Sequence, residues 1–488
     1  MLKKLVKESL IYGLSGYISK FIGVFLLPLY TFALKPADYG ILDLLNSVAV
    51  FSSFIIISGT DAAVGFYYFR NEFKEERSQL VSSGLIIRIV FGLTVALLLV
   101  LLSPPLTDLL FKNEETQYVR LYALYIAFNS VFFFTTELLR FQMKPWIYTI
   151  FSSGNVLVNI LSAILFVLIL GYGVTGAILA SIISYGIFAI AGVVYIFRNF
   201  ELRFSFKWAK NILSYGFPLI GTALASWVLV YSDRYFLNYF SGLEQIGIYS
   251  VGLKVAAIMG MIAGAFQMSW GPFAADIQYE PNARRIYAKV FQLYFIGNIL
   301  IIFVVSLFSD EILRLLTQPA YYSANSVIPL LCFSSLFIGA YFIANAGIGL
   351  TKKLYHTIWI TITAAGVNIL INALLTPKLL ATGSAIAILA ANFTIFLLTL
   401  LTSQKFYKIE YRYSVIIYLI VSTAIIIVLK SIFVFSLILK IILAAIYLLT
   451  IGYYMYKTFR HSEEFVKLVE VVKKFTRKTE EKPRSSEP

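Results

Sequence analysis

Histidine and cysteine are scarce in this sequence, and each shortage removes a class of function. Two histidines, His356 and His461, and one cysteine, Cys332, occur in 488 residues. They are too few and too scattered for a metal site built on imidazole or for a disulfide framework. No GxxxxGK[ST] loop occurs either, which argues against direct ATP drive. The sequence therefore predicts a protein without a metal site, a nucleotide cofactor or a catalytic centre.

Charge is scarce too. Charged residues make up 13% of the chain and hydrophobic residues 59%, and the mean hydropathy is +0.83, which excludes an ordinary soluble domain. Apolar runs long enough to cross a bilayer recur along the chain. The sequence predicts an all-α integral membrane protein with fourteen transmembrane helices, at 9–33, 41–60, 80–103, 118–137, 146–170, 174–197, 211–232, 245–269, 288–308, 324–349, 354–376, 383–403, 413–429 and 434–456.

The positive charges predict the orientation of these helices. Most of the 40 Lys and Arg residues fall in the N-terminal tail, in alternate connections and after Lys457. Because connections rich in Lys and Arg stay in the cytoplasm, both termini are expected there. We therefore expect a multi-pass membrane protein in contact with membrane lipids; the resemblance described below implies the bacterial cytoplasmic (inner) membrane. The net charge of +15 then reports topology and not nucleic-acid binding.

The chain repeats weakly with one offset. Gly40 in YGIL recurs 207 residues later as Gly247 in IGIY, and Gly176 recurs as Gly383. Halves separated by an even number of spans have the same orientation, so we expect two parallel six-helix bundles around a central cavity. The expected parts are a first bundle, a second bundle, two additional helices and a basic amphipathic tail on the cytoplasmic surface: 1–203, 204–410, 411–457 and 458–488.

Lys20 is a positive charge in the middle of the first apolar run. An ammonium at that depth costs roughly 2.5–3.5 kcal/mol on insertion scales, so an interaction should compensate for it. Gly13, Gly16 and Gly23 share its helical face at spacings of three and four. The lysine is therefore expected to face protein or a cavity and not lipid.

Lys254 poses the same problem near the middle of the expected span 245–269. Both lysines are too deep to reach the membrane surface comfortably, and embedded carboxylates are few. The interior is thus expected to be net positive, which suits an anionic substrate. The alternative is a structural ion pair, for instance of Lys20 or Lys254 with Asp43 or Asp61.

Further charged residues are candidates with open alternatives. Arg88 lies close enough to the cytoplasmic end of span 80–103 for its side chain to reach the surface. Asp61 and the Asp233-Arg234 pair are expected at span mouths, the pair as a gate or as a local cap or salt bridge. Two pairs of asparagines four residues apart, Asn155 with Asn159 and Asn368 with Asn372, would bind sugar hydroxyls or hold helices together. The residues assigned to gating or to the cavity are Asp61, Arg70, Asp233, Arg234, Asn155, Asn159, Asn368, Asn372 and Trp227.

The stretch YGFPLIGTALASWVLVYSDRYFLNYFSGLEQIGIYSVGLK, residues 215–254, resembles the signature region of polysaccharide flippases. These are the O-antigen and capsule-unit translocases of the multidrug/oligosaccharidyl-lipid/polysaccharide (MOP) exporter superfamily. The similarity lies in Gly-Phe-Pro, Asp233-Arg234 and Lys254. The opening segment, from Gly13 through Lys20 to Tyr39-Gly40, is similar as well, and the resemblance covers nearly the whole chain.

The resemblance implies a flippase and not an enzyme. Such proteins move an isoprenoid (undecaprenyl) pyrophosphate-linked oligosaccharide from the inner to the outer leaflet by alternating access, for polysaccharide biosynthesis. Cationic residues on the first, second and eighth helices hold the pyrophosphate. Lys20 and Lys254 match two of these helices and Arg88 is a further candidate, whereas the second span has no Arg or Lys.

The resemblance leaves a coupling ion, sodium or proton, and partnership with polysaccharide polymerase or assembly proteins open. A multidrug cation antiporter of the same superfamily is the alternative transporter. It would need carboxylates in the cavity, and the sequence offers few. A membrane glycan polymerase is the alternative enzyme, but such enzymes are expected to carry a large outer loop.

Overall fold

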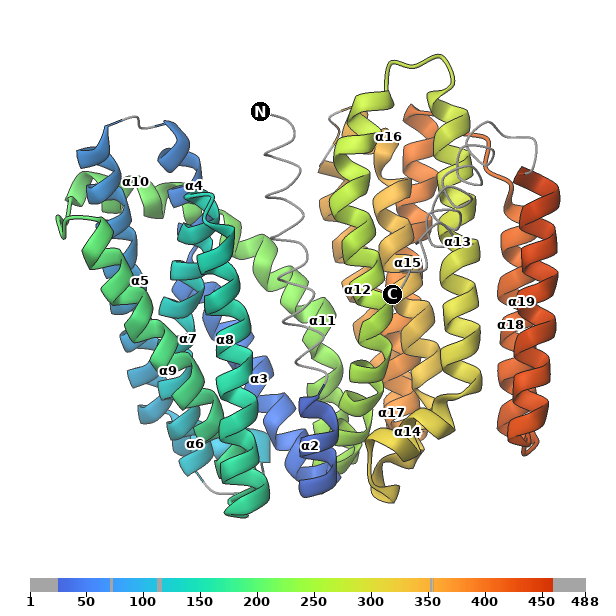
Figure 1. Cartoon of the computed structure of the whole chain (residues 1–488), viewed down its shortest axis with the longest axis horizontal. Helices are drawn as coiled ribbons and strands as arrows, with labels where there is room; N and C mark the ends of the chain where they lie inside the picture. The colour runs from blue at the N-terminus through green and yellow to red at the C-terminus, as the bar shows by residue number, and fades with distance from the viewer. Residues whose placement is uncertain (1–24, 71–72, 112–115, 352, 354, 460–488) are drawn as a thin grey trace, which may run out of the picture. The chain divides into compact units, whose positions relative to one another are not determined.

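The computed structural model describes residues 25–70, 73–111, 116–351, 353 and 355–459. Within these residues the chain forms helices and no strand (Figure 1). Lys20, with most of the first expected span, and the tail from residue 460 lie outside the described residues. The elements are α2 (Leu26–Ala33), α3 (Pro36–Ile57), α4 (Thr60–Arg70), α5 (Lys74–Leu101), α6 (Ser103–Phe111), α7 (Gln117–Phe141), α8 (Pro145–Ala163), the π-helix η1 (Ile164–Ile169), α9 (Gly173–Asn199), α10 (Phe206–Gly216), α11 (Leu219–Ser241), α12 (Leu243–Ile277), α13 (Ala283–Leu307), α14 (Ser309–Leu316), the 3-10 helix η2 (Pro319–Ser326), α15 (Ile328–Ala344), α16 (Ala346–Leu350), α17 (Tyr355–Phe406), α18 (Tyr413–Ile432) and α19 (Leu437–Phe459).

Eleven helices of the described residues are long and apolar enough to span a membrane. One of them, α17, contains two of the expected spans, 354–376 and 383–403. Its 52 residues are interrupted at Leu380, whose φ of 53° and ψ of −133° are not helical. Pro377 lies just before this break. The all-helical membrane fold expected from the hydrophobic runs is therefore confirmed.

The second span is longer than the sequence predicts. The expected range was 41–60, whereas α3 and α4 together cover Pro36–Arg70. Ser58 and Gly59 separate the two helices and have positive φ values of 42° and 67°. The expected span ended at residue 60 because the side chains of Thr60 and Asp61 are polar. In the structure a helix, α4, begins at Thr60 and continues the span. Asp61 consequently lies within the second span and not at its mouth.

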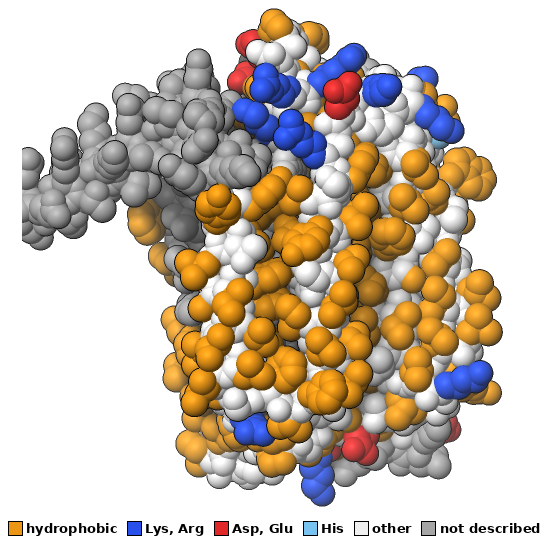
Figure 2. Space-filling view, turned by 90° about the vertical axis from the view of Figure 1, so that its right-hand side faces the viewer, with side chains coloured by type: hydrophobic (Ala, Val, Ile, Leu, Met, Phe, Trp, Pro, Cys, Tyr) orange, Lys and Arg blue, Asp and Glu red, His pale blue; other side chains and the backbone are white. Residues whose placement is uncertain are grey.

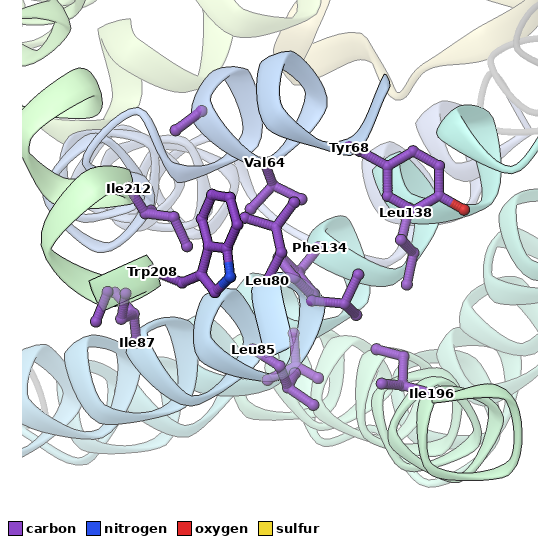
Figure 3. Packing of buried hydrophobic residues seen from close by; sticks show 14 of the residues in the cluster. Val64, Tyr68, Leu80, Leu85, Ile87, Phe134, Leu138, Ile196, Trp208 and Ile212 are labelled. Atoms are coloured by element: carbon purple, nitrogen blue, oxygen red, sulfur yellow. The ribbon is translucent and has the colours of Figure 1, made fainter. Parts of the chain in front are cut away.

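The N-terminal helices pack around a buried apolar cluster (Figure 3). It joins five helices, α4, α5, α7, α9 and α10, and Trp208 on α10 is 7% exposed. Its largest contributors are Val64, Tyr68, Leu80, Leu85, Ile87, Phe134, Leu138, Ile196, Trp208 and Ile212. Helices in a membrane associate through close van der Waals packing of this kind, so the cluster fixes the frame that carries the polar residues of α5 and α7.

The chain divides into two compact units, residues 1–291 with 309–411, and residues 292–308 with 412–488. In the second unit, α18 and α19 pack with the end of α13. The rings of Phe303 and Tyr447 stack with centroids 4.1 Å apart, and Gln292 donates a 3.0 Å hydrogen bond to the Tyr454 hydroxyl. The site described below lies wholly within the first unit.

The surface of the protein matches a lipid environment. On the face drawn in Figure 2, hydrophobic side chains cover the middle, while Lys and Arg gather mainly at the upper end. Large apolar side chains such as Leu449 and Ile438 on α19 are 73% and 71% exposed. Exposed apolar surface of this extent is stable against lipid and not against water. The chain is a multi-pass membrane protein.

Two glycines, Gly40 and Gly247, allow helices α3 and α12 to approach each other closely. A side chain at Gly40 on α3 would collide with the carbonyl oxygen of Leu243 on α12. A side chain at Gly247 on α12 would collide with the carbonyl oxygen of Pro36 on α3. Both glycines and both carbonyl partners are related by the 207-residue offset found in the sequence. The repeat is therefore seen in the structure as a reciprocal crossing of equivalent helices.

Candidate functional site

A polar cavity of about 320 Å³ opens beside this helix crossing. Five elements of the N-terminal half, α2, α3, α7, α8 and α9, supply nearly all of its wall, and α12 supplies one residue, Lys254. Aromatic rings, amides and hydroxyls dominate the lining, as in sites that fix a ligand through a few well-placed polar groups. The lining residues that matter below are Asp43, Asn46, Tyr125, Asn155, Asn159 and Lys254.

Lys254 faces this cavity, as the sequence predicts. It lies about 17 Å along α12 from the start of the helix, at 1.5 Å per residue, and its side chain is exposed. The expected alternative was an ion pair with Asp43 or Asp61. Both carboxylates have other partners, Arg234 and Arg88, and no ion pair engages Lys254 among the described residues. Its ammonium is therefore available to a ligand.

Asp43 and Arg234 form a buried ion pair between α3 and α11. The Arg234 Nε donates to Asp43 Oδ2 at 2.9 Å, and Nη1 donates to the Val230 carbonyl at 2.6 Å. The side chains are 14% and 8% exposed. Asp43 also lines the cavity, but Arg234 neutralises its charge, so that the described lining residues together carry the positive charge of Lys254.

The sequence placed Asp233 and Arg234 at the outer mouth of span 211–232, and this was wrong. The helix continues as α11 to Ser241, and both side chains are buried, Asp233 completely. The apolar run ended too early because two adjacent charges interrupt it. A local cap at a helix end is excluded for both residues, since each has partners on other helices.

Asp233 accepts hydrogen bonds from three side chains of the C-terminal half. The Tyr249 hydroxyl lies 2.6 Å from Oδ2, and the amides of Asn372 and Asn368 lie 2.8 and 3.2 Å from Oδ1. Asn372 in turn accepts from Thr376 at 2.9 Å. A buried carboxylate needs such donors because no water compensates for its charge. Asn368 and Asn372 therefore bind an anionic side chain and tie α17 to α11.

The equivalent amides in the N-terminal half behave differently. Asn155 and Asn159 on α8 both line the cavity. Asn159 donates to Ser184 at 3.2 Å and to Ser181 at 3.4 Å, which holds α8 against α9. Asn155 is 3% exposed, and its Nδ2 has no hydrogen-bond partner among the described residues. Of the four amides, Asn155 is the one with a donor free for a ligand.

Two other predicted residues do not line the cavity. The Trp227 indole donates to the Ser47 carbonyl at 3.0 Å and so joins α11 to α3. Arg70 is exposed at the end of α4, with its guanidinium carbon 3.9 Å from the centroid of the Phe66 ring. The structure thus gives Trp227 a packing contact between helices and places Arg70 on the surface.

Arg88 is buried in the N-terminal half, about 21 Å along α5 from its start at 1.5 Å per residue, and is 0% exposed. It forms an ion pair with Asp61 and donates to the Thr60 hydroxyl at 2.9 Å. The expected alternative, a side chain reaching the membrane surface, is wrong, because α5 begins at Lys74 and buries Arg88 deeper than the apolar run implied.

The tyrosines of α7 are part of the site that the sequence analysis missed. Tyr122 and Tyr125 line the cavity, with ring centroids 4.7 Å apart, and Tyr125 meets Tyr185 of α9 edge to face at 5.1 Å. The four-residue spacing of Tyr125 and Asn129, whose amide donates to the Tyr125 hydroxyl at 2.6 Å, was the available signal. It was hidden among the many aromatic residues expected at membrane interfaces.

Comparisons with known proteins agree on family and fold. Residues 5–278 match the family described as polysaccharide biosynthesis protein. The uncharacterized membrane protein MJ1068 of Methanocaldococcus jannaschii is 26% identical over 385 residues, which are 71% of this chain and 73% of that protein.

Two solved structures share the fold. The lipid II flippase MurJ, in an inward closed conformation, aligns with a TM-score of 0.73 at 14% identity, over 93% of this chain and 100% of that chain. An inward-facing multidrug resistance MATE family transporter of the MOP superfamily aligns with a TM-score of 0.62 at 14% identity, over 79% of this chain and 94% of that chain. The family match confirms the resemblance to polysaccharide export proteins drawn from residues 215–254, and the two structures confirm the fold that it implied.

Proposed function

This chain belongs to the polysaccharide biosynthesis protein family, and from that premise we propose that it is a flippase for lipid-linked oligosaccharide. The substrate is an isoprenoid pyrophosphate that carries a glycan, and it moves from the inner to the outer leaflet of the cytoplasmic membrane by alternating access. Both chain termini lie in the cytoplasm. The observation that carries the proposal is Lys254, a cation without a carboxylate partner among the described residues, in a polar cavity at membrane depth.

The charge of the cavity supports an anionic ligand. The only carboxylate among its described lining residues is Asp43, which is paired with Arg234. An ammonium without a carboxylate partner attracts phosphate oxygens, and it does so more strongly inside a protein cavity than in bulk solvent, because the effective dielectric constant is lower there. We propose that Lys254, together with Lys20, holds the pyrophosphate.

The charge of the cavity also disfavours the alternative function, a multidrug cation antiporter. Drug cations would require a carboxylate that is free to accept them, whereas Asp43 is engaged by a buried guanidinium. Asp233 is 0% exposed and is saturated by donors from Tyr249, Asn368 and Asn372. A flippase for an anionic lipid needs neither carboxylate to be free.

The experiment is removal of this chain from the organism that makes it. We expect a lipid-linked glycan to accumulate with its sugar facing the cytoplasm, where externally added glycosidase cannot reach it. The wild-type chain should restore exposure of the glycan, whereas Lys254→Ala, present in the membrane at the same amount, should not. Unchanged exposure of all lipid-linked glycans after removal would refute the proposal.

A further inference from the structure

A second cavity of about 350 Å³ adjoins the first in the N-terminal half. The two cavities share three lining residues, Asn46 on α3, Tyr125 on α7 and Tyr185 on α9. Where Lys254 lines the first cavity, Arg88 of α5 lines the second. A ligand with two chemically different parts can therefore occupy both, with the shared residues beside the junction.

Arg88, which lines this second cavity, has hydrogen-bond donors that are not used. Its Nη2 is engaged by Asp61 and Thr60, but Nε and Nη1 are buried and have no partner among the described residues. Leaving buried donors of a charged group unpaired is costly, so the geometry is built for an acceptor that arrives with a ligand. Asn129 and Ser130 line the same space and add further polar groups.

The two cavities differ in the charge of their described lining residues. Arg88 is compensated by Asp61, so the second cavity gains donors without gaining net charge. A neutral ligand rich in oxygen acceptors fits that environment better than a phosphate does. The rings of Tyr125, Tyr185 and Phe133 offer apolar faces of the kind on which a sugar ring packs.

We infer that the second cavity binds a sugar ring of the glycan, with Arg88 donating to its hydroxyl or acetamido oxygens while the pyrophosphate lies beside Lys254. This inference rests on the proposed function and deepens it. It assigns Arg88 to the glycan, whereas the sequence alone had grouped it with the pyrophosphate contacts. Asn155, with its free donor in the first cavity, serves the phosphate part of the ligand.

The test compares two soluble probes on the purified full chain in lipid nanodiscs. One is farnesyl pyrophosphate methylated on its terminal phosphate, which carries the same charge as the sugar-linked probe. The other is farnesyl pyrophosphate linked to a single sugar, chosen as the tightest binder among glucose, galactose, N-acetylglucosamine and N-acetylgalactosamine. The quantity measured is the sugar increment, the ratio of the two dissociation constants. A hydrogen bond from a charged donor predicts an increment of about tenfold or more for the wild-type chain.

The decisive variant is Arg88→Met combined with Asp61→Asn, which removes the donors without leaving a buried carboxylate unpaired. It should reduce the sugar increment to nearly one. Lys254→Met should weaken both probes by about tenfold and keep the increment. Arg203→Gln is the matched control, because Arg203 is 51% exposed and pairs with the exposed carboxylates of Glu75 and Glu201. It should change neither value.

Three results would overturn the inference. The wild-type chain could show no sugar increment, the double variant could keep it, or the double variant could weaken both probes equally, which would place phosphate at Arg88. Failure of the proposed phosphate site is read separately, from binding of the methylated farnesyl pyrophosphate that Lys254→Met leaves unchanged.

Discussion

Asp43 on α3 and Arg234 on α11 form an ion pair of 2.9 Å between residues that lie far apart in the sequence. Asp43 lies in the wall of the cavity that Lys254 of α12 also lines. Because Asp43 is engaged by Arg234, it cannot neutralise Lys254. The ion pair therefore links α3 to α11 and leaves Lys254 without a carboxylate partner among the described residues of the cavity, as the proposed anionic substrate would require.

Breaking this pair should destabilise the protein more than removing it entirely. Arg234→Met or Asp43→Leu leaves one buried charge without a partner, which costs about 3–5 kcal/mol. The double variant should recover much of the loss. The measurement is the apparent melting temperature of each purified chain in one detergent.

A surface pair serves as the control. Arg203 and Glu75 form an ion pair with side chains 51% and 65% exposed, so Arg203→Ala should cost at most about 1 kcal/mol. Equal melting temperatures for the Asp43 and Arg234 single variants and the wild-type chain would contradict the role assigned to the buried pair.

Asp233 should be required as a carboxylate. Asp233→Asn places an amide donor where Tyr249, Asn368 and Asn372 already donate, so at least one donor loses its acceptor. The expected loss is about 1–3 kcal/mol, seen as a lower melting temperature. Tyr249→Phe, which removes one donor and leaves two, should cost less. An Asp233→Asn variant as stable as the wild-type chain would show that the network does not depend on the charge.

The glycine crossing should not tolerate a methyl group. Gly247→Ala and Gly40→Ala each place a Cβ on a backbone carbonyl, of Pro36 and Leu243 respectively, so α3 and α12 must separate. Overpacking of this kind costs about 1–3 kcal/mol. Gly260→Ala on the same helix is the matched control, since a Cβ there meets nothing within 4 Å. A thermal shift no larger for Gly247→Ala than for Gly260→Ala would contradict this close approach.

The sequence was sufficient to predict the helical membrane fold and the position of Lys254 in the wall of a cavity. Hydrophobic runs can be read directly from the sequence. A lysine at the centre of such a run must face the protein interior or a cavity, because its charge is costly in lipid. Lys254 lines a cavity for that reason. The offset of 207 residues likewise anticipated the reciprocal crossing at Gly40 and Gly247, because equivalent helices meet at equivalent positions.

What the sequence could not predict was the pairing of the buried charges. Asp61, Asp233 and Arg234 were placed at span mouths because a charge ends an apolar run, and each is instead compensated by a residue far away in the chain. The amides show the same limit. Asn155 and Asn368 are equivalent by spacing, but the partner of Asn368 is Asp233 on α11, and only tertiary packing supplies it.

If Lys20 and Lys254 hold the pyrophosphate, substitutions at Lys254 should reduce the rate of flipping to different extents. Lys254→Arg should retain more flipping than Lys254→Gln, because charge and donors persist although the guanidinium has a different shape. Lys20→Ala and Lys254→Ala should each strongly reduce flipping. All rates are normalised to the amount of membrane-inserted protein, which separates loss of function from loss of folding.

The most direct measurement is flipping of undecaprenyl pyrophosphate-linked sugar in proteoliposomes that contain only the purified chain, with enzymatic access to the outer leaflet as the readout. The account predicts transfer by the wild-type chain and little transfer by Lys254→Ala at equal protein content. Wild-type rates per molecule from both Lys20→Ala and Lys254→Ala would contradict it.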